Sequence, residues 1–106
     1  RAPMSDQPAP AETLASMRAA IDAEDRALIE LLARRRALVR ELFEWKIRHG
    51  LPLIDPAREA LLLADRAALA ERHGLPASLV DRVLRAVLDA SHTDAAENLA
   101  RPPDLG

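Results

Sequence analysis

The sequence contains no cysteine, and only three of its 106 residues are glycine. Without cysteine no disulfide framework can form, and so few glycines argue against a glycine-rich phosphate loop. The three histidines are scattered and lack the spacing of metal ligands. No Ser-His-Asp or Cys-His arrangement for nucleophilic catalysis is recognisable. We therefore expect neither a metal nor any other cofactor.

Aromatic residues, strand patterns and long apolar runs are also scarce. Only Phe43 and Trp45 are aromatic, and no stretch alternates β-branched with polar residues as a half-buried strand does. No apolar run approaches a membrane span, so we expect no membrane association. The net charge of −2 argues against nucleic acid as a partner. The absence of cysteine is compatible with the reducing cytoplasm, where we expect the protein to be located.

The sequence is rich in Ala, Leu and Arg, which favour helices. The pentapeptide RHGLP occurs twice, at Arg48–Pro52 and Arg72–Pro76. It is typical of a helix end, since basic residues suit the negative C-terminus, glycine adopts the left-handed conformation and proline prevents continuation. An all-α fold is predicted, with three helices at about Glu12–His49, Pro56–His73 and Ala77–Leu99.

The two ends of the chain show no helical periodicity. Residues 1–11 contain three prolines and residues 101–106 contain two. We predict flexible tails there, flanking one helical domain over residues 12–100. Asp55 is the expected N-cap of the second helix, with Pro56 at its first position.

The first predicted helix carries charged residues on its apolar seam. Positions alternately four and three residues apart form a heptad stripe that faces packing partners: Leu14, Arg18, Ile21, Asp25, Leu28, Leu32, Arg35, Val39, Leu42 and Lys46. A buried charge must be paired or must meet a ligand of opposite sign. Three cations against one anion therefore predict a small anionic ligand inside a helical bundle. Alternatively, the long side chains carry their charges out to water.

The length of this helix predicts a second subunit. A helix of about 38 residues is about 57 Å long, whereas a compact domain of this size has a radius of gyration of about 13 Å. The rest of the chain is too short to cover such a helix. We therefore expect an obligate homodimer.

The third helix has its own apolar stripe, broadened by Leu79, Val83 and Leu88. Its positions are Val80, Leu84, Val87, Ser91, Ala95 and Asn98. Ser91 is either a small packing residue or a hydroxyl that faces the same cavity as the cations. His92 and Asp94 are expected to point away from this stripe.

Two stretches resemble the all-helical chorismate mutases: MRAAIDAEDRALIELLARRRALV from Met17 to Val39, and EWKIRHGLPLIDPAREALLL from Glu44 to Leu63. The most specific part is the pattern of Lys46, Asp55, Arg58 and Glu59, together with Arg18 and Arg35. The resemblance extends over residues 13–98. It implies an intertwined homodimer of a long and two shorter helices that converts chorismate, a small dicarboxylate, to prephenate in aromatic amino acid biosynthesis.

The catalytic residues implied by the resemblance are cations. Arg18 resembles the arginine that reaches into the partner subunit's site to clamp one substrate carboxylate. Arg35 resembles the arginine of the same subunit that holds the other carboxylate. Lys46 resembles the lysine that donates to the ether oxygen. Asp25 matches a common acid of the family that we interpret as structural.

Four further positions resemble substrate-binding residues. Arg58 matches an arginine at the start of the second helix that lies close to a carboxylate. Glu59 is similar to the acid that accepts from the ring hydroxyl, and Asp55 to a residue whose backbone meets that hydroxyl. Ser91 resembles the serine of the third helix near a carboxylate.

One position departs from the family pattern. Ala95 stands where the family usually has Gln or Glu to hydrogen-bond the ether oxygen, so Ala95→Gln is expected to increase turnover. Three alternatives therefore stay open. The chain is a mutase of aminodeoxychorismate, whose ammonium Glu59 could face, an isochorismate pyruvate lyase, or a helical dimerisation module without activity.

Overall fold

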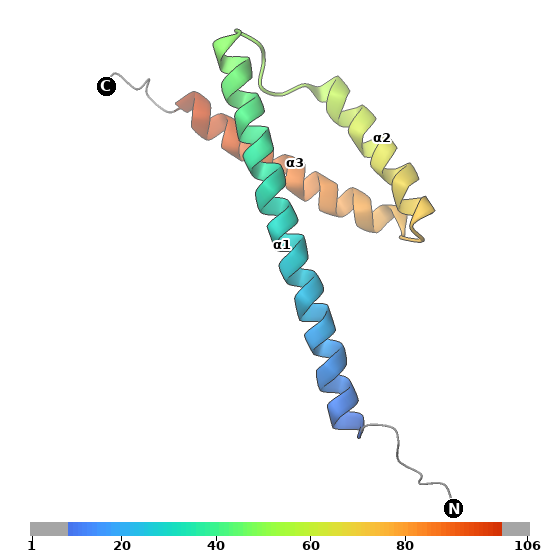
Figure 1. Cartoon of the computed structure of the whole chain (residues 1–106). Coiled ribbons are helices and arrows are strands. Elements are labelled where there is room, and N and C mark those ends of the chain that lie inside the picture. The colour runs from blue at the N-terminus through green and yellow to red at the C-terminus, as the bar shows by residue number, and fades with distance from the viewer. Residues whose placement is uncertain (1–8, 101–106) are drawn as a thin grey trace, which may run out of the picture. The chain divides into compact units, whose positions relative to one another are not determined.

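The computed structural model describes the backbone of residues 9–100 and the side chains of residues 9–97. It contains three helices in this range, α1 (Pro10–Arg48), α2 (Pro56–Arg72) and α3 (Ala77–Ala100), and no strand (Figure 1). The predicted all-α class and the number of helices are confirmed. Residues 1–8 and 101–106 of the predicted tails, and the side chain of Asn98, lie outside the described part.

The first helix begins two residues earlier than predicted. Pro10 is its first residue, and the N–H of Thr13 donates to the backbone oxygen of Ala9 at 3.0 Å. Proline suits this position because the first helical N–H has no partner within the helix. Assigning Pro10 and Ala11 to a tail was therefore wrong. α1 and α2 each end one residue before the predicted histidine, and α3 ends one residue after Leu99.

Both copies of RHGLP end a helix as predicted. Gly50 and Gly74 have φ angles of 66° and 69°, the left-handed conformation that glycine adopts without strain. In the first copy the N–H of Leu51 donates to the oxygen of Lys46 at 2.9 Å, and that of Gly50 to Ile47 at 3.2 Å. These two bonds form a Schellman motif, which satisfies carbonyls that the helix end would leave unpaired.

The chain consists of two structural units, residues 1–37 and 38–106. The first unit is the N-terminal part of α1. Its aliphatic seam residues are exposed in the single chain, with exposed fractions from 40% to 59%: Leu14, Ile21, Leu28 and Leu32. Ile29 and Leu31 beside them are also exposed. An apolar stripe of this extent is what a second subunit would cover.

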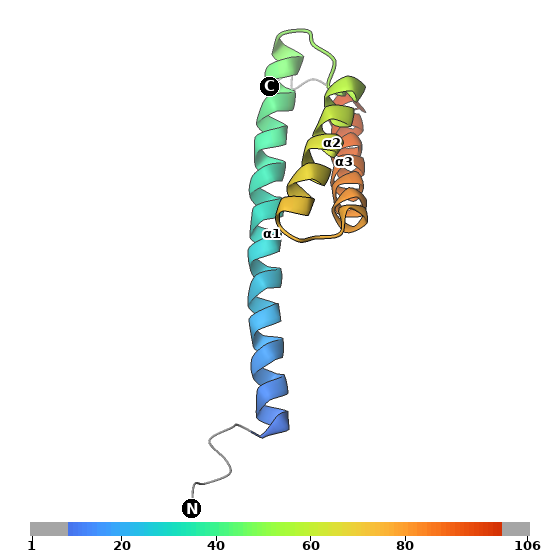
Figure 2. The ribbon, with the colours of Figure 1, turned by 90° about the vertical axis from the view of Figure 1, so that its right-hand side faces the viewer.

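The core of the second unit is small. Phe43, Leu53 and Ala95 form a buried cluster, against which Val39 and Ile54 pack. α2 and α3 contact each other directly, and they lie next to each other in Figure 2. This arrangement places the end of α1, the loop after it and the second half of α3 around one apolar centre.

Phe43 of α1 is buried, whereas its neighbour Leu42 on the predicted seam is 46% exposed in the single chain. The other aliphatic seam residues in the first unit are exposed to a similar extent. Burial of the seam against a second subunit therefore stays a prediction. Phe43 adds a core contact that the seam did not include.

Candidate functional site

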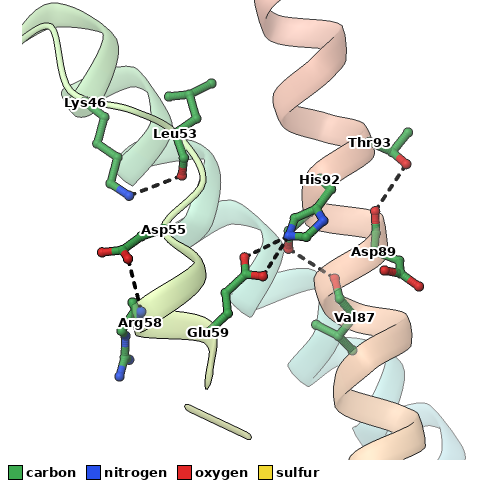
Figure 3. Close-up of polar contacts among 10 residues, drawn as sticks. Lys46, Leu53, Asp55, Arg58, Glu59, Val87, Asp89, His92 and Thr93 are labelled. Atoms are coloured by element: carbon green, nitrogen blue, oxygen red, sulfur yellow. Dashed lines mark hydrogen bonds and ion pairs between the residues drawn. The ribbon is translucent and has the colours of Figure 1, made fainter. Parts of the chain in front are cut away.

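Lys46 lies in the last turn of α1 and is half-buried. Its Nζ atom donates a hydrogen bond to the backbone oxygen of Leu53 at 3.2 Å (Figure 3). The Schellman motif turns the chain back toward this lysine, since the N–H of Leu51 bonds to the Lys46 backbone oxygen. A lysine ammonium has three N–H donors. The bond to Leu53 uses one of them and leaves two that an acceptor on a ligand can use.

Asp55 sets the start of α2, as predicted. Its backbone is extended, with φ −124° and ψ 94°, and its Oδ1 accepts a hydrogen bond from the Arg58 backbone N–H at 3.1 Å. This is the N-cap arrangement, with Pro56 at the first helical position. The cap places Arg58 and Glu59 in the first turn of α2. The Arg58 side chain is exposed, and Glu59 is half-buried.

Glu59 is held by His92 of α3. The His92 Nε2 atom lies 2.9 Å from Oε1 and 2.8 Å from Oε2 of Glu59. Figure 3 shows the two side chains pointing toward each other from α2 and α3. His92 was expected to point away from the apolar stripe of α3, and the structure turns it toward Glu59 of α2. Its position four residues after Leu88, which is buried, was the available signal, because residues four apart share a helix face.

Ser91 uses its hydroxyl within its own helix. It is half-buried, and Oγ donates to the backbone oxygen of Val87 at 3.1 Å. Such a bond to the preceding turn is common for serine in a helix. The hydroxyl proton is thus already engaged, while the oxygen keeps a lone pair with which it can accept.

Ala95 belongs to the packed core, with only 2% of its surface exposed beside Phe43 and Leu53. The neighbouring residue Asp94 is also buried, and its Oδ1 lies 3.8 Å from Nη2 of Arg40 on α1. Asp94 was expected to point away from the packed side of α3, and that expectation was wrong. The burial of both residues shows that residues 94 and 95 face the second unit's interior.

The structure brings Lys46, Asp55, Arg58 and Glu59 onto one stretch of the second unit. Lys46 bonds to the loop that reaches Asp55 two residues later, and the cap then presents the first turn of α2. Arg18 and Asp25 are exposed and Arg35 is half-buried, all three in the first unit. Their place relative to Lys46 stays a prediction.

Residues 9–97 contain neither a metal-binding group of side chains nor a membrane-spanning helix. No group of three or more His, Asp or Glu residues there could hold a metal ion. Within that range no helix combines the length and the apolar character needed to cross a membrane.

Comparison with known proteins gives this arrangement a context. A T-protein of Enterobacter agglomerans is 48% identical over 80 residues, which are 76% of this chain and 21% of that protein. A T-protein of Haemophilus influenzae is 40% identical over 83 residues, 78% of this chain and 22% of the relative. The chain thus spans about a fifth of the length of these two relatives.

A third relative is closer to this chain in size. The 4-amino-4-deoxychorismate mutase of Streptomyces venezuelae is 36% identical over 67 residues, 63% of this chain and 65% of that protein. The family model described as chorismate mutase type II matches residues 17–93. That range contains every residue singled out above for catalysis or substrate binding, from Arg18 to Ser91. The chain belongs to the type II chorismate mutase family.

Proposed function

We propose that this chain catalyses the rearrangement of chorismate to prephenate. The observation that carries the proposal is the burial and hydrogen bonding of Lys46. Lys46 is half-buried, and its ammonium is oriented by the Leu53 backbone oxygen, with two N–H groups left for an acceptor. The loop that holds it leads directly to the first turn of α2. Family membership supports the same reaction.

The chemistry requires positioning and charge, and no proton transfer. One carbon–oxygen bond breaks as one carbon–carbon bond forms. Arg18, Arg35 and Arg58 hold the two substrate carboxylates, so that the flexible ether is bound in its compact reactive conformer. Lys46 stabilises the negative charge that grows on the ether oxygen as its bond stretches.

The ring end of the substrate is assigned to the remaining residues. Glu59 accepts a hydrogen bond from the ring hydroxyl, and the backbone of Asp55 meets the same group. Ser91 lies near a carboxylate, to which its hydroxyl donates after turning away from the Val87 backbone oxygen. The cap at Asp55 supports this assignment because it orients the first turn of α2 without using the Glu59 side chain.

The active form in this proposal is a homodimer in which Arg18 enters the partner subunit's site. The exposed apolar stripe of α1 supports it, because a stable monomer rarely leaves so long an apolar surface in water. Sedimentation equilibrium tests this: we expect a dimer wherever the protein is folded. A folded monomer of 11.6 kDa would contradict it. Chorismate is the proposed ligand, and we propose no nucleic acid or membrane partner. The cytoplasmic location stays a prediction.

A second candidate substrate is 4-amino-4-deoxychorismate. The relative from Streptomyces venezuelae carries that substrate in its name, and a carboxylate such as Glu59 can pair with an ammonium as well as accept from a hydroxyl. Ala95 leaves the ether oxygen without a side-chain donor at its position. These two features favour testing both substrates side by side.

The deciding experiment mixes the purified protein separately with chorismate, isochorismate and 4-amino-4-deoxychorismate and identifies the products. We expect loss of chorismate absorbance with formation of prephenate. Lys46→Ala is the matched negative control, and it should lose the activity without losing helical content. Pyruvate release from isochorismate would indicate a lyase. A protein inert toward all three substrates would be a helical dimerisation module.

A further inference from the structure

His92 joins α3 to α2 at the acid that the proposed mutase uses. The two residues lie 33 positions apart in sequence, and Nε2 approaches both carboxylate oxygens of Glu59, at 2.8 and 2.9 Å. The Glu59 side chain is 22% exposed and that of His92 is 41% exposed. Nε2 therefore lies in front of the open end of the carboxylate and donates to the two oxygens jointly.

This contact limits how Glu59 can turn. A glutamate side chain has three rotatable bonds, and its last torsion is broad when nothing restrains it. A donor shared by both oxygens restrains that torsion and the position of the carboxylate together. The contact of the next residue on α3, from Thr93 Oγ1 to the Asp89 backbone oxygen at 3.2 Å, lies on the other side of the helix (Figure 3). It does not compete for Glu59.

The shared donor also changes what Glu59 can bind. A carboxylate has about four lone-pair directions, and the His92 N–H occupies the two between the oxygens. The two outer lone pairs remain, enough for the single hydrogen bond of a hydroxyl. An ammonium has three donors and a full charge, so it gains most from a carboxylate that no other donor shares. His92 thus penalises an ammonium more than a hydroxyl.

We propose that His92 is a positioning residue that orients Glu59 and makes the site prefer a ring hydroxyl over a ring ammonium. This inference rests on the proposed function, because it assumes that Glu59 meets the ring substituent of the substrate. It adds a residue of α3 to the determinants of substrate choice. Chorismate would be the better substrate, and 4-amino-4-deoxychorismate the poorer one.

The test compares wild type, His92→Leu and His92→Gln with both substrates, by kcat and KM. His92→Leu removes the donor, and we expect the ratio of kcat/KM for chorismate to that for 4-amino-4-deoxychorismate to fall about fivefold. That size corresponds to a partly exposed charged contact. His92→Gln keeps an N–H donor, so its ratio should stay within about twofold of wild type. Thr93→Val is the matched control on α3 and should leave the ratio unchanged.

The Glu59→Gln background supplies a further check. If His92 acts through Glu59, adding His92→Leu to Glu59→Gln should not change the substrate ratio further. Circular dichroism of each variant shows that the helices are retained. A merely structural role of His92 would reduce kcat/KM equally for both substrates in every background.

The outcomes separate the two proposals. An unchanged ratio in His92→Leu, or a His92→Gln variant that behaves like His92→Leu, overturns the positioning role while the mutase proposal stands. A wild-type protein inert toward both substrates overturns the proposed function, and this inference falls with it. Three results together support the inference. The ratio falls in His92→Leu, it stays near the wild-type value in His92→Gln, and it does not fall when His92→Leu is added to Glu59→Gln.

Discussion

The Nζ atom of Lys46 donates to the backbone oxygen of Leu53, 3.2 Å away and seven residues further along the chain. A carbonyl carries only a partial negative charge, so it orients the ammonium without neutralising it. A carboxylate in the same place would have paired the positive charge fully. The full positive charge therefore stays available to a ligand, held at the end of α1 by the loop that leads to α2.

Lys46→Ala should reduce turnover strongly. Removing one donor that stabilises charge in a transition state lowers kcat by about a hundredfold to a thousandfold. Steady-state kinetics with chorismate measure the effect, and circular dichroism should show unchanged helical content. Arg48→Ala is the matched control, since Arg48 is an exposed cation in the same last turn. If Lys46→Ala kept the wild-type kcat, its assignment to the ether oxygen would be wrong.

Arg18→Ala and Lys46→Ala should each be inactive alone and recover activity when mixed. If Arg18 enters the partner's site, a mixed dimer has one site with both defects and one intact site. Random exchange should give about a quarter of wild-type activity, because half of the dimers are mixed and half of their sites are intact. Exchange is verified by mass spectrometry of differently tagged subunits. Full exchange without recovery would show that each site is built from one chain.

Asp55→Ala should destabilise the fold. The Asp55 side chain caps α2 through the Arg58 N–H at 3.1 Å, and removal of such a cap costs about 1 kcal/mol. Urea unfolding followed by circular dichroism measures the change in the free energy of unfolding. Asp55→Asn should restore most of the loss, because asparagine caps nearly as well. Equal stability of Asp55→Ala and wild type would show that the cap contributes nothing.

Ala95→Gln tests the departure from the family pattern. The sequence predicts that the glutamine adds a donor and raises turnover. The structure adds a cost, because Ala95 is packed beside Phe43 and Leu53, and overpacking a core lowers the free energy of unfolding by about 1–3 kcal/mol. Ala96→Gln, at the exposed neighbouring position, should be nearly neutral in urea unfolding. Equal stability of the two variants would show that residue 95 has room for a long side chain.

Local features of the fold could be predicted from the sequence because they depend on neighbours in the chain. The two RHGLP segments, with Gly50 and Gly74, end helices through bonds that span five residues or fewer. The cap at Asp55 spans three. Backbone preferences decide such features almost independently of the rest of the molecule. The family resemblance likewise depends on residues that lie close together in sequence, from Lys46 to Glu59.

Tertiary packing decided which face of each helix became buried. The heptad stripe did not include Phe43, and packing with Leu53 and Ala95 buried it. On α3, packing against Phe43 and Leu53 set the rotation of the helix, and that rotation buried Ala95 and Asp94. It also turned His92 toward Glu59.

The sequence by itself determined the three helices, their end signals and the cationic residues that predict an anionic ligand. Only the tertiary structure decided the partners of those residues. The contact of His92 with Glu59 and the ion pair of Arg40 with Asp94 join residues 33 and 54 positions apart. Such pairs depend on the rotation and offset of whole helices. Those are set by the sum of many weak packing contacts, which no local pattern contains.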